Sequence, residues 1–212
     1  MTQVDGKSGL RKRLRRRRNA LGRVDQARAA ANLAERLKAL TAFRRSTRIA
    51  LYLANDGEID PAGILRWSLG HGKRCYAPII PGDRQHPLRF AEITAHTRFA
   101  NNRFGIAEPA VSGGRLIGVR ELDLVLVPLV GFDRHGNRIG MGGGFYDRTF
   151  AFKRASPRSL PQLVGLAHDI QRVDGIDADN WDIPLSAVVT DRRIYRCAPV
   201  RPGVEMKNGI KI

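Results

Sequence analysis

The fold is decided by Leu122–Val130, which reads LDLVLVPLV, and by the glycine-rich run Arg138–Arg148 that follows it, RIGMGGGFYDR. A continuous apolar run of this kind is typical of a strand that is buried on both faces, as in a parallel sheet covered by helices. The residues from Asp147 to Arg154 favour a helix. The pattern therefore predicts a strand, a glycine-rich turn and a helix in succession.

The glycine-rich run suits the binding of an anion. Four glycines occupy the five positions from Gly140 to Gly144, and glycine lets backbone N–H groups approach a phosphate closely. Two arginines flank the loop and Asp147 stands at its exit, which suggests a polyphosphate held by backbone and arginine, with a metal held by carboxylate. A glycine-rich connector with solvated charges is the alternative. The run has neither the Lys-Ser/Thr ending of a P-loop nor G-x-G-x-x-G spacing.

Helical and strand patterns alternate along the rest of the chain. We expect two helices within residues 6–40, with a break near Gly22, and a third from Asp60 to Leu69 with Asp60 as its N-cap and Pro61 in first position. Strands are expected at residues 48–54, 74–80, 88–93, 162–167 and 187–190, and a loop at 101–109. The alternation predicts an α/β fold, a three-layer sandwich with a mainly parallel central sheet and helices on both faces. Binding sites in such sheets lie at the carboxyl ends of strands, where the glycine-rich run begins.

Composition limits the class of protein. The 212 residues are 42% hydrophobic, so we expect a single domain over residues 1–212, with a short loose tail at its C-terminal end. No apolar run reaches the ~20 residues that span a bilayer, and the basic N-terminus lacks the apolar core of a signal peptide, so we expect a cytoplasmic protein. Cys75 and Cys197 stand far apart, which predicts reduced thiols and no zinc site.

Much of the net charge of +17 lies near the N-terminus, where no acidic residue occurs between residues 6 and 24. Leu10, Leu14 and Leu21 recur at helical spacing within this basic block, which predicts an amphipathic helix with a basic outer face. We interpret most of these arginines as a solvated helix face, with one or two at the end of the helix able to serve a phosphate. An RNA-associated binding protein is the rival interpretation. The first 40 residues contain no aromatic side chain for base stacking, so nucleic-acid binding is expected to be at most non-specific.

Five segments, in order, carry a resemblance to one family. They are Lys7-x-x-x-Arg11; a strand and turn before Glu58; Asn102–Pro109; Pro128–Asp133 continued by Gly136–Arg148; and Val164–Ala167 with Trp181–Leu185 and Val188–Thr190. Together they span nearly the whole chain, and they resemble the 5-formyltetrahydrofolate cyclo-ligases, also called methenyltetrahydrofolate synthetases.

The resemblance implies an enzyme that converts 5-formyltetrahydrofolate to 5,10-methenyltetrahydrofolate with ATP and Mg²⁺, and that releases ADP and phosphate. The formyl oxygen is a poor leaving group until it is phosphorylated, after which N10 can attack the formyl carbon. Such chemistry needs alignment and charge stabilisation more than a side-chain nucleophile. Another Mg·ATP-dependent enzyme on the same fold is a further alternative. We expect a monomer.

The resemblance also assigns residues to roles. It places Lys7, Arg11 and the loop at the ATP, with Arg138 and Tyr146 as catalytic residues, and it places Asp147 at Mg²⁺. The loop residues for ATP are Arg138, Ile139, Gly140, Met141, Gly142, Gly143, Gly144, Phe145 and Tyr146, and those for the folate are Leu53, Glu58, Met141, Gly142, Gly143, Gly144 and Phe145.

Each assignment has a simpler alternative, and the chain departs from the family at two places. Glu58 could be an ordinary turn carboxylate, Leu53 a core residue and Asp147 a charge that favours a helix N-terminus. Ser186 stands where some members carry a second Mg²⁺-site aspartate, for which Asp182 or Asp191 could substitute. Leu88 replaces a methionine that is common in the family, with Phe90 retained two residues later.

Overall fold

The computed structural model describes residues 6–83, 86–110, 116–157 and 159–197 as an α/β fold. The helices are α1 (Lys7–Asn19), α2 (Arg23–Ala39), α3 (Thr41–Arg45), α4 (Ala62–Gly70) and α5 (Phe145–Thr149), with 3₁₀ turns η1 (Val119–Glu121), η2 (Ala151–Arg154) and η3 (Asp169–Gln171). The strands are β1 (Arg48–Ala50), β2 (Arg74–Ile79), β3 (Arg89–Ile93), β4 (Phe99–Asn101), β5 (Ala107–Pro109), β6 (Leu116–Ile117), β7 (Leu124–Pro128), β8 (Gly131–Phe132), β9 (Arg138–Ile139), β10 (Gln162–Ala167), β11 (Ala187–Thr190) and β12 (Ile194–Arg196).

Eight strands form the central sheet, in the order β12-β11-β10-β7-β1-β2-β3-β6. The inner pairs β2–β1, β1–β7, β7–β10 and β10–β11 are parallel. The outer pairs β2–β3, β3–β6 and β11–β12 are antiparallel. The predicted α/β fold with a mainly parallel sheet is confirmed.

Strand β7 shows why its sequence is apolar without alternation. Its side chains point to opposite faces in turn, and both faces are covered. Leu124 and Leu126 pack into the core beneath α2, α3 and α4, whereas Val125 and Val127 pack into a second core on the other face. All four side chains are therefore buried.

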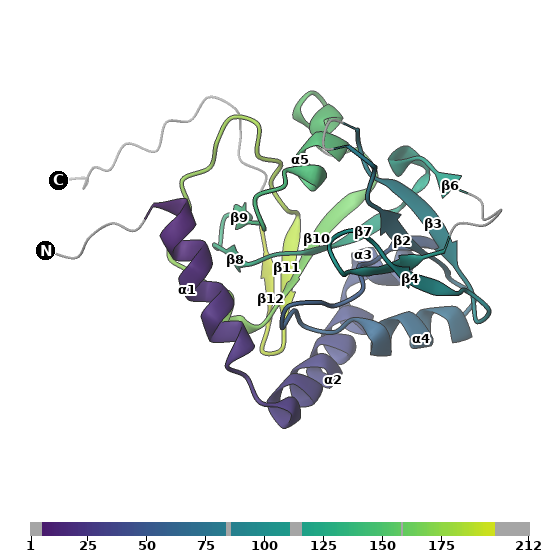
Figure 1. Ribbon diagram of the computed structural model, residues 1–212, viewed down its shortest axis with the longest axis horizontal. Helices are drawn as coiled ribbons and strands as arrows, with labels where there is room; N and C mark the ends of the chain where they lie inside the picture. The colour runs from purple at the N-terminus through teal and green to yellow at the C-terminus, as the bar shows by residue number, and fades with distance from the viewer. Residues whose placement is uncertain (1–5, 84–85, 111–115, 158, 198–212) are drawn as a thin grey trace, which may run out of the picture.

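The helices are unevenly distributed around the sheet. Leu33 of α2, Phe43 of α3 and Ile64 of α4 cover one face, and α2 and α4 lie in the lower part of Figure 1. The short α5 and η2 lie on the other face, with Phe150 between them in the second core. Helix α1 packs instead on η3 and beside the β8–β9 hairpin, through a small cluster of Leu14, Val130, Ile139 and Ile176.

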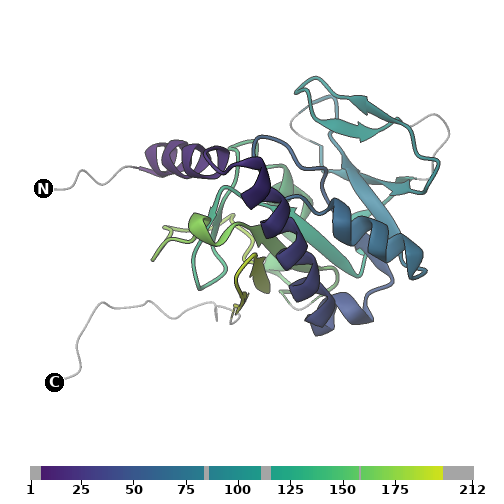
Figure 2. The ribbon, with the colours of Figure 1, turned by 90° about the horizontal axis from the view of Figure 1, so that it is seen from below.

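Several expectations about elements need correction. Residues 101–109 were expected to be a loop, but Phe99–Asn101 and Ala107–Pro109 pair as the β4–β5 hairpin, and only its tip is a loop. In Figure 2 this hairpin projects at the end of the molecule away from α1. The helix expected at residues 147–154 is divided into α5 and η2. The next helix begins at Ala62 with Pro61 as its N-cap, so the prediction of Asp60 as N-cap is wrong by one residue; Oδ1 of Asp60 nevertheless accepts the N–H of Ala62 at 2.8 Å.

Two remaining expectations concern the cysteines and the chain end. Cys75 and Cys197 are free thiols, as predicted, and both are buried, which raises the pKa of each thiol to about 11. The loose tail expected at the end of the chain lies outside the described residues. Within the described part of the chain, every helix is too short or too polar to cross a membrane.

The order of the strands opens a crevice at one end of the sheet. From β1 the chain crosses outward to β2, and from β7 it later crosses in the opposite direction to β10. The loops that leave the carboxyl ends of β1 and β7 therefore diverge. Such a point of reversal is where open α/β sheets bind ligands.

Candidate active site

A cavity of about 1320 Å³ occupies this crevice. Its walls come from α1, from the ends of β1, β2 and β7, from the β4–β5 hairpin and from the glycine-rich loop. The sequence-predicted site residues all line it, namely Lys7, Arg11, Leu53, Glu58, Arg138, Ile139, Gly140, Met141, Gly142, Gly143, Gly144, Phe145, Tyr146 and Asp147. The fold thus collects around one space predicted residues that lie up to 140 residues apart in the chain, from Lys7 to Asp147.

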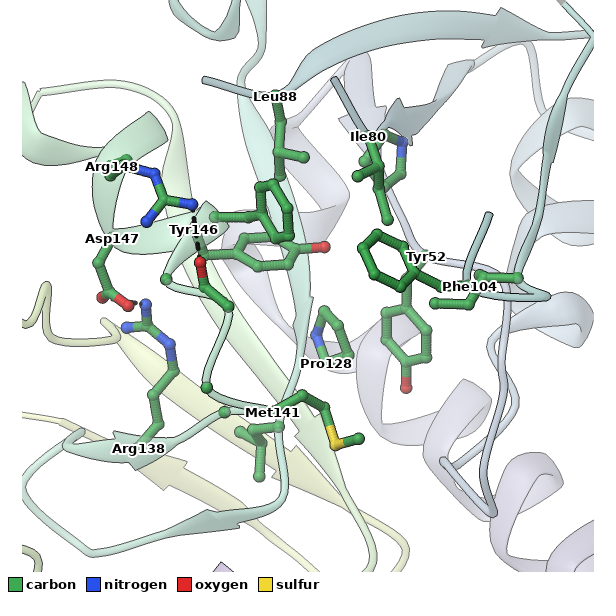
Figure 3. A pocket seen from close by; sticks show the side chains of 18 of the residues that line it. Tyr52, Ile80, Leu88, Phe104, Pro128, Arg138, Met141, Tyr146, Asp147 and Arg148 are labelled. Atoms are coloured by element: carbon green, nitrogen blue, oxygen red, sulfur yellow. Dashed lines mark hydrogen bonds and ion pairs between the residues drawn. The ribbon is translucent and has the colours of Figure 1, made fainter. Parts of the chain in front are cut away.

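The glycine-rich loop needs glycine at defined positions. Gly142 has φ +93° and Gly144 has φ +63°, a region of backbone conformation that other residues rarely adopt. A Cβ on Gly144 would also lie 2.7 Å from Nη1 of Arg148, whose Nη2 donates to the Gly143 carbonyl at 2.7 Å. The loop is therefore shaped by its glycines and held from behind by Arg148, as the dashed line in Figure 3 shows.

Arg138 and Asp147 form an ion pair at the floor of the loop. Nη2 of Arg138 lies 2.5 Å from Oδ1 of Asp147, and Nη1 donates to the Ile183 carbonyl. The same Oδ1 accepts the N–H of Ile183 at 3.2 Å. The Arg138 side chain is only 7% exposed and that of Asp147 is 25% exposed, so the arginine is fixed while the carboxylate still reaches the cavity.

Helix α1 brings two cations to the cavity. Nε of Arg11 donates to the Gly140 carbonyl at 2.7 Å, which ties the helix to the loop. Nζ of Lys7 lies 2.5 Å from Oδ2 of Asp179 and 3.5 Å from Oδ2 of Asp182. The hydrogen bond with Asp179 raises the pKa of Lys7 and keeps it charged. Both cations stand where an anion on the glycine-rich loop would meet them.

Glu58 is a carboxylate in a mostly buried setting. Its side chain is 14% exposed, and Oε2 accepts the N–H of Asn55 at 3.1 Å. Burial raises its pKa to about 7, and the nearby Arg18 opposes the shift. A buried carboxyl group with a raised pKa inside a cavity is a candidate functional residue, and the role of Glu58 stays a prediction.

Apolar and aromatic side chains line two facing sides of the cavity. In Figure 3 the rings of Tyr146 and Phe104 approach from opposite sides, with Pro128 between them and Met141 at the lower edge. Phe104 is 42% and Met141 52% exposed, although both side chains are large and apolar. Burial raises the pKa of Tyr146, which therefore remains a neutral hydrogen-bond donor. A flat heteroaromatic ligand fits between such walls.

The donor set suits a magnesium ion that a phosphate would share. Among the described residues, no group of three or more His, Cys, Asp or Glu side chains forms a complete metal site. Mg²⁺ is usually held by one or two carboxylates together with phosphates and waters. Oδ1 of Asp147 holds Arg138 and Ile183, and Oδ2 accepts no hydrogen bond from the described chain, so one carboxylate oxygen is available beside the loop.

Comparison with known proteins identifies the family. The model of the 5-formyltetrahydrofolate cyclo-ligase family matches residues 3–191. The chain belongs to the 5-formyltetrahydrofolate cyclo-ligase family. The cyclo-ligase of Haemophilus influenzae is 35% identical over 176 residues, which cover 83% of this chain and 92% of that protein. The Escherichia coli K12 cyclo-ligase is 34% identical over 182 residues, with 86% and 98% coverage.

Solved structures of the family have the same fold. The 5,10-methenyltetrahydrofolate synthetase of Aquifex aeolicus superposes with a TM-score of 0.77 at 28% identity and covers 95% of this chain and 98% of its own. The Mycoplasma pneumoniae synthetase, at 22% identity, superposes with a TM-score of 0.68 over 87% of this chain and 98% of its own, which supports the fold alone.

The structure clarifies the two departures from the family pattern. Ser186 does not line the cavity; its hydroxyl donates to the Leu163 carbonyl at 2.8 Å, and it borders a separate hollow at the opposite end of β10. Of the two aspartates considered in its place, Asp182 lines the cavity, whereas Asp191 instead accepts the N–H of Asp169. Leu88 lines the cavity, where a methionine would occupy the same wall.

Several lining residues had no predicted role. Phe104, Asn102 and Glu108 come from the β4–β5 hairpin, and Trp181 comes from the loop before β11. Phe104 and Trp181 are exposed aromatic residues inside segments that resemble the family, so the signal was present in the sequence. It was missed because an aromatic side chain in a loop does not by itself indicate which ligand it contacts.

Proposed function

We propose that this cavity is the active site in which the cyclo-ligase closes 5-formyltetrahydrofolate to 5,10-methenyltetrahydrofolate at the expense of ATP. The observation that carries the proposal is the convergence of a glycine-rich loop, two cations of α1 and a mostly buried carboxylate on one space. The loop and the cations suit a triphosphate. Glu58 suits the N–H groups of a pterin.

The reaction needs two displacements at adjacent centres. The formyl oxygen takes the γ-phosphoryl group of ATP, and ADP leaves; N10 then bonds to the formyl carbon and loses its proton, and the bond from that carbon to the former formyl oxygen breaks as phosphate leaves. Charge builds on the transferring phosphoryl group and on the leaving phosphate, so fixed donors are required more than a nucleophile. Arg138 and the backbone N–H groups of Gly142–Phe145 would supply them, and Tyr146 would donate from the folate side.

The proposal includes finer assignments, which the family resemblance implies and which the cavity lining supports. Lys7 and Arg11 would hold the outer phosphates, Leu53 and Met141–Phe145 would contact the folate, and Asp147 would hold a Mg²⁺ ion through its available oxygen. Bound there, the ion would neutralise phosphate charge. A monomer in the cytoplasm remains our expectation for the enzyme, although one curated relative, from Arabidopsis thaliana, carries a mitochondrial designation.

An absorbance assay tests the proposal. Purified protein, Mg·ATP and 5-formyltetrahydrofolate should give methenyltetrahydrofolate with one ADP and one phosphate for each product molecule. Omission of ATP should abolish the product. Folded protein that binds ATP but forms no ATP-dependent product would contradict the proposal.

A further inference from the structure

A fully buried arginine joins α1 to the turn that carries Glu58. Arg18 has no exposed surface, yet it lies in a run of arginines whose neighbours Arg16 and Arg17 are exposed. Its Nε donates to the Asp56 carbonyl at 2.8 Å, its Nη2 to Asp56 Oδ2 at 2.8 Å and its Nη1 to the Leu129 carbonyl at 3.2 Å. A buried guanidinium with three such bonds fixes the geometry around it.

The turn is held at other points as well. Arg15 Nε lies 2.7 Å from Asp56 Oδ2, and Asn19 Nδ2 donates to Asp56 Oδ1 at 3.0 Å. The fit is close, because a Cβ on Gly57 would lie 2.0 Å from Oδ1 of Asn19. The C-terminal half of α1 therefore holds the turn through hydrogen bonds and ion pairs, whereas the N-terminal half of α1 carries Lys7 and Arg11.

Arg18 also lies close to Glu58. Nη2 of Arg18 lies 3.9 Å from Oε1 of Glu58, so the cation stands behind the carboxylate on the side away from the open cavity. The other titratable groups that face Glu58 are Asp56 of the same turn, Tyr52 after β1 and Tyr146 of α5; the charge of Glu58 contributes to the raised pKa values of both tyrosines. Arg18 lowers the pKa of Glu58, and Asp56 raises it.

We propose that Arg18 is a positioning residue for folate binding, which holds the Asp56–Glu58 turn in place and keeps the Glu58 carboxylate directed at the pterin. This inference rests on the proposed function, because it needs Glu58 to contact the folate. Arg18 acts through Glu58 and does not line the cavity. Its loss should therefore affect the folate more than ATP.

The test compares Arg18→Gln with Arg17→Gln, an exposed neighbour on the same helix. We expect Arg18→Gln to raise KM for 5-formyltetrahydrofolate about tenfold and to leave KM for ATP within about twofold. At saturating Mg·ATP, the acid limb of kcat/KM for the folate should move alkaline by about one pH unit or more, because the neutral side chain no longer favours the ionised carboxylate. Arg18→Lys should keep the limb near its wild-type position while KM stays raised, and Arg17→Gln should change neither quantity.

A second variant should shift the acid limb in the opposite direction, which a purely structural role of Arg18 would not produce. Asp56→Asn removes the negative charge that raises the pKa of Glu58, so the acid limb of kcat/KM for the folate should move to lower pH. This variant also tests the proposal if Arg18→Gln does not fold. Equal increases in KM for both substrates, or limbs that shift the same way in the two variants, would overturn the assignment of Arg18. Glu58→Gln separates the two proposals. If this variant keeps a normal KM for 5-formyltetrahydrofolate and a normal acid limb, the role of Glu58 in folate binding is contradicted. If it removes an acid limb that Arg18→Gln leaves in place, only the role of Arg18 is contradicted.

Discussion

Arg138 and Asp147 are joined by a 2.5 Å ion pair directly beneath the glycine-rich loop, and Ile183 binds both side chains through its backbone. The two carboxylate oxygens of Asp147 therefore have separate roles. One oxygen orients Arg138, and the other is available to a cation beside the phosphates.

Asp147→Asn should reduce kcat at least a hundredfold while the melting temperature changes little. The amide can still accept a hydrogen bond from Arg138, but it is a far weaker ligand for Mg²⁺. The measurement is kcat against Mg²⁺ concentration, with Asp25→Asn as an exposed control that loses only a surface pair with Arg28. Wild-type activity with normal Mg²⁺ dependence would show that Asp147 is only a helix-start charge.

Replacement of Lys7 and Arg11 by alanine should raise KM for ATP strongly. A charge-assisted hydrogen bond to a phosphate contributes roughly 1.5–3 kcal/mol, which is about tenfold or more for each residue. Arg11→Ala should have the larger single effect, because Lys7 is already paired with Asp179. Arg16→Ala with Arg17→Ala is the matched control on the same helix, since both side chains are exposed.

The control double variant also tests the RNA-binding alternative. Non-specific binding to nucleic acid should weaken, and its salt dependence should flatten by about one unit of slope for each phosphate that the variant no longer binds. The enzyme interpretation predicts weak, salt-sensitive binding in filter or fluorescence assays. Tight binding to RNA at physiological salt, together with an ATP affinity indifferent to Arg11, would favour the alternative.

Glu58→Gln should stabilise the unliganded protein at pH 8 even as it impairs folate binding. The pKa of Glu58 rises from 4.5 to about 7 on folding, so the folded state binds more protons in this range and the free energy of unfolding falls as pH increases through it. The penalty present above pH 7 is at most about 3 kcal/mol. Thermal melts should show a gain for Glu58→Gln at pH 8 that falls to about a quarter at pH 5; equal gains at both pH values would contradict the assigned shift.

Gly142→Ala should impair ATP binding without unfolding the protein. A Cβ at φ +93° imposes strain of about 1–3 kcal/mol on the loop, and the loop can relax by moving its N–H groups away from the phosphates. Gly63→Ala, in α4, is the control, because nothing lies within 4 Å of the added Cβ. We expect KM for ATP to rise at least tenfold for Gly142→Ala alone, measured by steady-state kinetics beside circular dichroism.

The residue pattern of the sequence predicted the central strand of the sheet better than the short strands. Strand β7 and the loop after it could be predicted, because burial on both faces demands a continuous apolar run and a close phosphate approach demands glycine. Strands β6, β8, β9 and β12 have only two or three residues each. Such short strands depend on partners distant in the chain and leave little periodicity to detect.

The arginines of α1 show what the sequence could not decide. Arg16, Arg17 and Arg18 look alike in the basic block, and a solvated face describes the first two correctly but not Arg18. Its burial follows from the side of the helix on which it lies, four residues after the buried Leu14. That spacing was visible, but the Asp56 turn that receives the guanidinium lies 38 residues away and meets α1 only in the folded chain.

The attachment of α1 outside the main sheet has a consequence for how the molecule opens. Its four-residue cluster is small beside the two cores around β7, so α1 should open and exchange its amide hydrogens while the sheet remains closed. Each such opening would carry Lys7 and Arg11 away from the glycine-rich loop and release the Glu58 turn. Binding of either ATP or the folate would then protect the amide hydrogens of α1 from exchange with deuterium. Because each substrate would stabilise the ordered state of α1, each would favour binding of the other.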